Sequence, residues 1–404
     1  MKRKQHFVVC STLFLLTLTP LATLYGQGPS NTIKKASSPA LKASQVFVQR
    51  EQKASPQIKT TLTQLRSQVV ERKLNFSVGY TEALDKKLEM LAGTRAPDNL
   101  PSLAEKQNTI ASEMIKVDSS ARDEYLRVHP NALPELKYWQ IVAPCTALKA
   151  FDWRKSGKVT PVRNQGGCGS CWAFGAMGAF EGSYLIRNNA ALDTSEQHVL
   201  NCSGSGSCGG GWHAGVFDWM IRNGNGAEVS DPYTATDHAC KAGVSTPYRA
   251  VAWGYVKSDG GIPSVAEMKA ALCQHGPLTV AVYATPLFQA YTGGVFDEKD
   301  TSHGINHDIT LIGWDDSKHA WLIKNSWGTY WGETGGFGTE RGYMWIDYDS
   351  NNIGYGSAWV QPQNRFYILP SRFLQLMPDI KPLPGPMKRI PIQQTPIPHA
   401  PSGF

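Results

Sequence analysis

The stretch GGCGSCWAF, residues 166–174, places two cysteines three positions apart, behind a glycine-rich loop and ahead of a tryptophan. A cysteine pair of this kind can bind a metal, form a redox couple, form a disulfide or attack a substrate. A zinc ribbon needs a second close cysteine pair, but Cys202 and Cys208 stand six positions apart and no His-x-x-x-His partner follows. A thioredoxin-type pair lies in a short βαβ unit, whereas this chain is much longer. Both interpretations are therefore disfavoured.

A nucleophilic role for Cys171 fits the rest of the chain better. Residues 171–187 have the apolar period of a helix, so Cys171 would stand at a helix N-terminus. A thiolate attacks well when a helix N-terminus and a neighbouring imidazolium lower the thiol pKa. His307 lies 136 residues downstream and can supply that imidazole, and Asn325 can hold the ring. Gln165, six residues before Cys171, can donate a hydrogen bond to an oxyanion.

The N-terminal region predicts helices interrupted by one extended segment. Residues 27–60 are polar without a sustained period, and residues 74–81, LNFSVGYT, are expected to be extended. Three helical pieces are expected: around Leu62, Leu65 and Val69; after Thr81 as N-cap, with Leu84, Leu88 and Leu91 on one face and Gly93 as a stop; and after a capping-box pattern at Ser102 and Glu105.

The composition changes at Phe151, from which Gly, Trp and Cys are dense as far as Val360. The helix predicted at 171–187 is followed by runs rich in β-branched and aromatic residues. The expected strands are 278–284, 307–315, 320–327 and 342–348. This order predicts an α+β fold in which a helical subdomain packs beside a sheet-rich one, with a cleft between them. Residues 364–404 carry nine prolines and predict an extended tail.

The first 26 residues have the pattern of a secretory signal peptide. Lys2, Arg3 and Lys4 precede a mostly apolar stretch that Ser, Thr and Pro interrupt. An uncleaved anchor is the alternative, but no later stretch approaches the roughly 20 apolar residues of a membrane helix. We therefore expect a secreted or periplasmic protein without stable membrane insertion. The net charge of +7 is spread without a long basic block, which argues against nucleic-acid binding.

The cysteine count indicates one free thiol. The chain has eight cysteines, and Cys10 lies within the signal segment, so seven remain in the exported chain. Export permits disulfides, and an odd number of cysteines leaves one unpaired.

These motifs, CGSCW with its preceding Gln and the downstream His and Asn segments, resemble those of the papain family of cysteine peptidases. The resemblance covers roughly Ala150 to Gln361, and the segments NHDITLIGWDD, ERGYMW and NNIGYGSAWV are most similar to bacterial members. It implies a papain-like fold, with a helical left subdomain and a β-barrel-like right subdomain on either side of the active-site cleft. The implied segments are a signal peptide at 1–26, a propeptide at 27–145, a peptidase domain at 146–363 and the proline-rich tail at 364–404.

The resemblance also implies a role for each motif residue. Cys171 would be the nucleophile, and His307 its ion-pair partner and then the general acid. Asn325 would orient His307, and Gln165 would form the oxyanion hole with the Cys171 N–H. Trp327 would shield the His–Asn hydrogen bond from water. Taken singly, Gln165 could be a loop amide, Trp327 a core residue and His307 a buried histidine without a catalytic role. Together with Cys171, these alternatives are disfavoured.

By the same resemblance, Cys168 pairs with Cys208 and Cys202 with Cys240. Each bridge would close a loop of about 40 residues, worth roughly 3–4 kcal/mol in the loop-entropy model. A third bridge between Cys145 and Cys273 would leave Cys171 as the free thiol.

Substrate selection is expected to follow the run CGGGW. Gly210 and Gly211 match glycines whose backbone pairs with an extended peptide. Trp212 would form a wall, and Ala358 the floor, of a pocket for a bulky apolar side chain two residues before the cleaved bond. Asp308 follows His307, where many relatives have a small apolar residue. It would raise the pKa of His307 if it reached the site, but such a residue ordinarily faces away.

We therefore expect a monomeric, secreted endopeptidase of polypeptides, made as a zymogen whose propeptide inhibits it. No metal, nucleotide or organic cofactor is implied. No insertion with paired histidines lies between Asp218 and Cys240, so an exopeptidase is disfavoured. An acyl-transferring relative that uses the same thioester stays open, as does a binding protein that keeps the fold without turnover. The second is disfavoured because no catalytic position is substituted.

Overall fold

The structure is a computed structural model, which describes residues 45–132 and 145–370 of the 404-residue chain. The expected signal peptide and the tail from residue 371 onward lie outside the described residues. None of the helices in these two described ranges is both long and apolar enough to cross a membrane.

A nine-stranded sheet forms the centre of the described structure. Along the sheet the order is β1-β7-β10-β9-β8-β6-β11-β5, with β2 paired to β8, and neighbours are antiparallel apart from β7 and β10. The strands are β1 (Phe76–Val78), β2 (Ala150–Asp152), β5 (Ala250–Tyr255), β6 (Leu278–Val282), β7 (Tyr291–Phe296), β8 (His307–Asp315), β9 (Ala320–Lys324), β10 (Tyr343–Asp347) and β11 (Tyr355–Pro362). A separate hairpin pairs β3 (Gly206–Ser207) with β4 (Gly210–Gly211). The four expected strands are confirmed.

Helix α5 (Cys171–Asn188) packs against β6, β8 and β11 and is almost wholly buried. It confirms the helix predicted at 171–187. Small residues let it approach the sheet closely: a Cβ on Gly178 would lie 2.2 Å from Thr310 Oγ1, and one on Gly175 would lie 2.9 Å from Thr279 Oγ1. The close packing fixes Cys171, the first residue of α5, against the strand that begins with His307. The other helices of this part are α6 (Glu196–Cys202), α7 (His213–Arg222), α8 (Val265–His275) and α9 (Pro286–Gln289).

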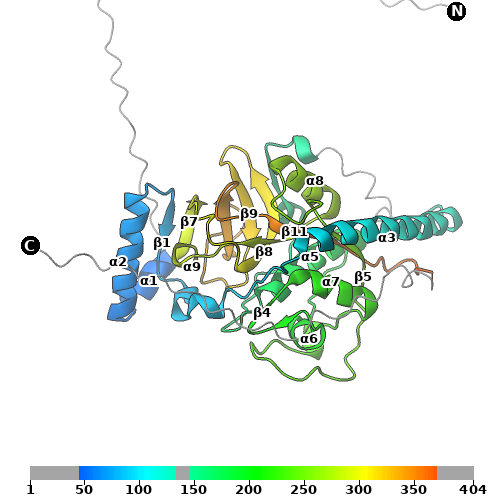
Figure 1. Cartoon of the computed structure of the whole chain (residues 1–404), viewed down its shortest axis with the longest axis horizontal. Coiled ribbons are helices and arrows are strands. Elements are labelled where there is room, and N and C mark those ends of the chain that lie inside the picture. The colour runs from blue at the N-terminus through cyan, green and yellow to red at the C-terminus, as the bar shows by residue number, and fades with distance from the viewer. Residues whose placement is uncertain (1–44, 133–144, 371–404) are drawn as a thin grey trace, which may run out of the picture. The chain divides into compact units, whose positions relative to one another are not determined.

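The region before residue 133 packs against both sides of this unit. Helices α1 (Gln45–Gln52) and α2 (Pro56–Glu71) lie beside β1, which extends the sheet by pairing with β7. Helix α3 (Leu100–Val128) packs against β5. Figure 1 shows α1 and α2 beside β1 and β7, and α3 beside α7 and β5, with the connecting chain crossing between them. The helix around Leu62–Val69 and the extended segment are therefore confirmed.

Two local predictions in this region were wrong. Residues 84–91 form 3₁₀ turns at Glu82–Asp85 and Leu88–Met90 instead of a helix, and the Thr81 hydroxyl donates to the Gln289 carbonyl instead of capping. The α3 helix begins at Leu100, before the expected capping box, because Pro101 suits the first helical turn.

The packed structure continues past Gln363. Asn364 and Tyr367 are buried, and the Tyr367 hydroxyl donates to Asp118 of α3 at 2.9 Å. Asp118 also forms an ion pair with Arg187 of α5 at 2.5 Å and accepts from Gln361. The first residues of the expected tail thus help to fasten α3 to the rest of the molecule.

Candidate active site

Cys171 stands at the N-terminus of α5 and is the free cysteine of the described residues. The other six described cysteines form the three expected bridges, Cys145–Cys273, Cys168–Cys208 and Cys202–Cys240. Cys171 has no exposed surface. Burial raises the pKa of its thiol to about 11, and the Asp308 charge adds to the rise, while hydrogen bonds from Thr94 and from the backbone of Asp308 and Gly93 oppose it. The thiol is therefore protonated at neutral pH in this structure.

His307 is held by Asn325. Its Nε2 donates to Asn325 Oδ1 at 2.8 Å, which leaves Nδ1 as the ring nitrogen without a hydrogen-bond partner among the described residues. The Trp327 ring covers the imidazole, with centroids 4.6 Å apart. Burial lowers the pKa of His307 to about 4, against the opposing effects of Asn325, Asp308 and the Leu91 backbone. Both His307 and Cys171 are thus neutral near pH 7 in this structure.

Gln165 is oriented by Ser326, whose Oγ donates to Gln165 Oε1 at 2.7 Å. This leaves the Gln165 amide nitrogen to donate to the Leu91 carbonyl at 2.9 Å and to the Cys168 carbonyl at 2.8 Å. A backbone carbonyl therefore already occupies the position to which Gln165 donates. The sequence analysis missed Ser326, which precedes Trp327 but lies 161 residues from Gln165.

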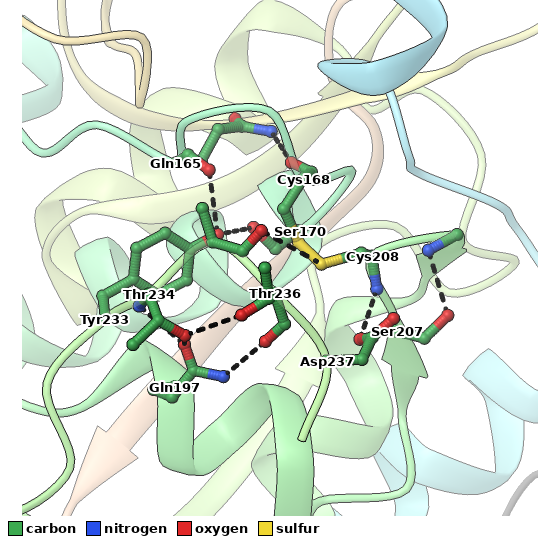
Figure 2. The surroundings of a disulfide bond; sticks show 12 residues. Gln165, Cys168, Ser170, Gln197, Ser207, Cys208, Tyr233, Thr234, Thr236 and Asp237 are labelled. Atoms are coloured by element: carbon green, nitrogen blue, oxygen red, sulfur yellow. Dashed lines mark hydrogen bonds between the residues drawn. A yellow bond between two sulfur atoms is a disulfide. The ribbon is translucent and has the colours of Figure 1, made fainter.

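The loop before Cys171 is held by a disulfide and a tyrosine. Figure 2 shows the Cys168–Cys208 bridge together with Tyr233, whose hydroxyl donates to the Gln165 carbonyl at 2.9 Å and lies 2.6 Å from Ser170 Oγ. Burial raises the pKa of Tyr233, so its hydroxyl stays protonated. Tyr233 was also missed, because nothing in its local sequence points to the loop 68 residues earlier.

Residues 91–95 run directly through this site. The Gly93 N–H donates to Cys171 Sγ at 3.3 Å, and Thr94 Oγ1 lies 3.2 Å from the same sulfur. Thr94 pairs in parallel with Gly211: Gly211 N–H donates to the Gly93 carbonyl at 2.9 Å, and Arg95 N–H donates to the Gly211 carbonyl at 3.0 Å. A Cβ at Gly93 would lie 1.9 Å from the Gly169 carbonyl oxygen, so only glycine fits here.

Of the residues expected to bind peptide, Gly211 pairs directly with residues 93–95. Gly210 and Gly211 form β4, and Trp212 is buried with its Nε1 donating to the Tyr255 hydroxyl at 3.0 Å. On β11 the residue in contact with the Trp212 ring is Gly356, where a Cβ would lie 2.4 Å from the indole. Ala358 is fully buried between β5 and β6, and its role as a pocket floor stays a prediction.

Asp308 was expected to face away from the site. It is instead fully buried next to it. Its carboxylate contacts His213 at 3.0 Å. Cross-strand pairing explains the burial, since β8 is covered by β6 on one edge and by α5 on a face.

Two side-chain groups in the described ranges have a spacing that a metal ion could use. In the first, His198 lies near Cys202 and Cys240, but these two cysteines are bonded to each other. The second, His319 with Asp347 and Asp349, lies largely at the surface and away from Cys171, so neither group belongs to this site.

Comparison with known proteins shows to which family the chain is similar. A family model described as "Papain family cysteine protease" matches residues 147–358. "Cysteine proteinase 1" of Entamoeba histolytica is 34% identical over 246 residues, covering 58% of this chain and 73% of that protein. Human "Cathepsin L2" is 38% identical over 233 residues, covering 53% of this chain and 65% of that protein. The expected likeness to bacterial members was wrong, since the homologues found are eukaryotic.

A solved structure extends the likeness beyond the region that the family model matches. A "Recombinant stem bromelain precursor" superposes with a TM-score of 0.54 at 25% identity, covering 76% of this chain and 89% of that one. The 76% of this chain that superposes is more than the part that follows residue 147. Some of the region before the matched domain therefore also superposes on the precursor structure.

Proposed function

Since this chain belongs to the papain family of cysteine proteases, we propose that it is an exported endopeptidase, made as a zymogen, which acts through a thioacyl intermediate on Cys171. Export is supported by the basic and apolar N-terminus and by three disulfides, which persist in oxidising compartments. Polypeptides are the substrates, and residues 27–145 are the propeptide.

The main support for this proposal is that the backbone of residues 91–93 contacts both Gln165 and Cys171. Gln165 donates to the Leu91 carbonyl, and the next turn of chain touches the Cys171 sulfur. A substrate would place its reacting carbonyl where Gln165 Nε2 and the Cys171 N–H can both donate. Such preorganised donors stabilise the oxyanion of acyl transfer.

In the proposed reaction, His307 acts first as a base and then as an acid. In the open enzyme His307 takes the thiol proton, and the Cys171 thiolate attacks the carbonyl carbon. His307 then gives the proton to the departing amine as the C–N bond breaks. Water, deprotonated by His307, cleaves the thioester and restores the thiol. Asn325 keeps the ring aligned by accepting from Nε2 throughout.

The propeptide inhibits this reaction in two ways. It presents hydrogen-bond donors to the sulfur, the Gly93 N–H and the Thr94 hydroxyl, in place of a carbonyl carbon. It also excludes water, so that the thiol pKa rises to about 11 and the His307 pKa falls to about 4. Neither charge of a thiolate–imidazolium pair forms near pH 7 under these conditions, and the segment is not attacked.

We further propose a preference for a bulky apolar side chain two residues before the cleaved bond. Its support is the large indole of Trp212, next to the Gly211 backbone that a peptide would pair with. Gly356 leaves no side chain of its own against this indole.

The experiment compares the full-length protein with a form trimmed near Cys145, each beside Cys171→Ala, in a mild reductant. We expect the trimmed wild type to hydrolyse a peptide amide with leucine at that position faster than one with glycine. The Cys171→Ala forms should be inactive. Equal activity of the full-length and trimmed proteins would refute inhibition, and activity in Cys171→Ala would refute the nucleophile.

A further inference from the structure

A fully buried histidine–aspartate pair lies next to the proposed catalytic residues. His213 is the first residue of α7, and Asp308 follows His307 in β8. His213 Nδ1 lies 3.0 Å from Asp308 Oδ2, and neither side chain has exposed surface. His213 Nε2 lies 3.0 Å from the carbonyl oxygen of Gly356 in β11. The pair therefore joins a helix of one subdomain to two strands of the other.

The hydrogen bonds fix how many protons the pair holds. A carbonyl oxygen only accepts, so His213 Nε2 carries a proton. The short contact at Nδ1 needs a second proton between the imidazole and the carboxylate. Whichever atom carries that proton, the pair has no net charge. When the proton lies on Nδ1, Asp308 is negative and His213 balances it.

Asp308 is the member closer to the catalytic residues. Its backbone hydrogen-bonds the Cys171 sulfur, and its charge acts on both Cys171 and His307. A negative charge there raises the pKa of the thiol and that of the imidazole. His213 instead packs among aromatic rings, those of Trp212, Phe217 and Tyr255.

Other charged and titratable groups also surround Asp308. Besides His213, these are Cys171 of α5, His307 of β8, Tyr255 of β5 and, around a narrow internal gap, Arg163, Glu181, Glu196 and Lys324. The last four are two cations and two acids. His213 is thus the direct partner of the Asp308 carboxylate. Of the other four groups, Arg163 forms an ion pair with Asp193, and burial raises the pKa of Glu196.

We propose that His213 and Asp308 are positioning residues that tie the His307 strand to α7 and set the pH range over which Cys171 and His307 act. This inference rests on the proposed roles of Cys171 and His307. In this proposal neither side chain touches the reacting atoms. The Asp308 side chain acts through its charge and its strand, and His213 acts through Asp308.

The two single variants should move the alkaline limb of the pH profile in opposite directions. That limb reports loss of the His307 proton in the working enzyme. Asp308→Asn removes the member of the pair that lies nearer His307 and whose charge raises the His307 pKa, so the limb moves to lower pH. His213→Gln removes the side chain that balances the Asp308 carboxylate, so the effect of Asp308 on His307 grows and the limb moves to higher pH. Each shift of the limb should be about 0.5–1 pH unit, the size expected for a charge next to His307.

The experiment measures kcat/KM from pH 4 to 10 for the trimmed wild type, Asp308→Asn, His213→Gln and the double variant. The double variant should resemble Asp308→Asn, since it has no charge left to balance. If Asp308→Asn is recovered poorly, Asp308→Ala tests the same charge with a smaller side chain and should shift the limb in the same direction.

The outcomes separate this inference from the proposed function. A trimmed wild type without activity overturns the proposed function itself. An active wild type whose limb stays in place in the variants, or moves in the same direction in both single variants, overturns only the role of the pair. A merely structural role would lower kcat/KM at every pH and leave the limbs where they are.

Discussion

At the scale of single residues, the site depends on side chains that orient other side chains. Ser326 fixes the Gln165 amide, and Asn325 fixes the His307 ring. The four proposed catalytic residues could be picked out from the sequence because each stands in a recognisable local motif. Ser326, Tyr233 and His213 could not, because their importance comes from contacts with residues that are distant in the sequence.

Gln165→Ala in the trimmed enzyme should lower kcat by about 10²–10³, because one donor to the oxyanion is lost. Gln197→Ala is a matched control: Gln197 is also a buried glutamine, but its amide donates to the Thr236 carbonyl instead of to the Cys168 and Leu91 carbonyls that Gln165 contacts. It should lower stability and leave kcat within a few fold. Equal losses of kcat in both variants would count against an oxyanion role for Gln165.

At the scale of elements, tertiary contacts decided where the predictions from sequence failed. The pattern Leu84, Leu88 and Leu91 is helical, yet the chain there forms 3₁₀ turns. Gln289 explains this, since its side-chain amide donates to the carbonyls of Ala83 and Lys86, which a helix would use internally. Helix α5 and strand β8 were predictable because their apolar periods agree with their burial.

Gly178→Ala tests the close approach of α5 to the sheet. Helix propensity alone would make this change stabilising by about 0.5–1 kcal/mol. The new Cβ would lie 2.2 Å from Thr310 Oγ1, however, so we expect destabilisation by about 1–3 kcal/mol. Denaturant unfolding of the trimmed protein measures this. Gly167→Ala is the control, because the one atom near its new Cβ would be Met90 Cε at 3.5 Å, which the trimmed protein lacks. A stabilised Gly178→Ala would show that α5 packs less closely than described.

Gly93→Ala tests the segment that crosses the site. Its Cβ would lie 1.9 Å from the Gly169 carbonyl oxygen, a backbone atom that cannot move aside. We expect the full-length variant to lose inhibition and to cleave peptide amides at least ten times faster than the full-length wild type. After trimming, the two proteins should be identical. Ser120→Ala, on the exposed side of α3, should leave inhibition intact. Unchanged inhibition in Gly93→Ala would place the inhibitory contact elsewhere.

At the level of the whole chain, the proposed propeptide is held over the site by contacts on both sides of it. Strand β1 extends the sheet at one side, and α3 is fastened at the other through the buried Asp118–Arg187 ion pair. The catalytic groups between them are kept neutral. The sequence predicted an inhibitory propeptide only through the family resemblance, because no local pattern shows which residues cross the cleft.

Acidification should loosen this closed state. With the propeptide in place, the pKa of His307 is about 4, below its ordinary value of 6.5. His307 therefore binds a proton less readily in this closed form than in an open form without the propeptide over the site. The contribution of His307 to closure is therefore complete above pH 6.5 and is lost as the pH falls towards 4, by up to about 3 kcal/mol. Hydrogen exchange at residues 93–95 in full-length Cys171→Ala, corrected for intrinsic rates, should accelerate between pH 7 and 4.5.

The control for this pH effect is the double variant Cys171→Ala with His307→Gln, which has no imidazole to protonate. Its corrected exchange at residues 93–95 should change much less over the same pH range. If both proteins accelerate equally, other groups, not His307, open the propeptide.

The most direct test of the central claim, that the propeptide covers Cys171 and keeps its thiol protonated, is the alkylation rate of Cys171. Iodoacetamide is added at pH 6.5 to a mixture of full-length and trimmed protein, and intact mass separates the two products. We predict that the trimmed form reacts at least 100 times faster, because its thiol is exposed and ionised beside His307. Equal rates for the two forms would contradict the account.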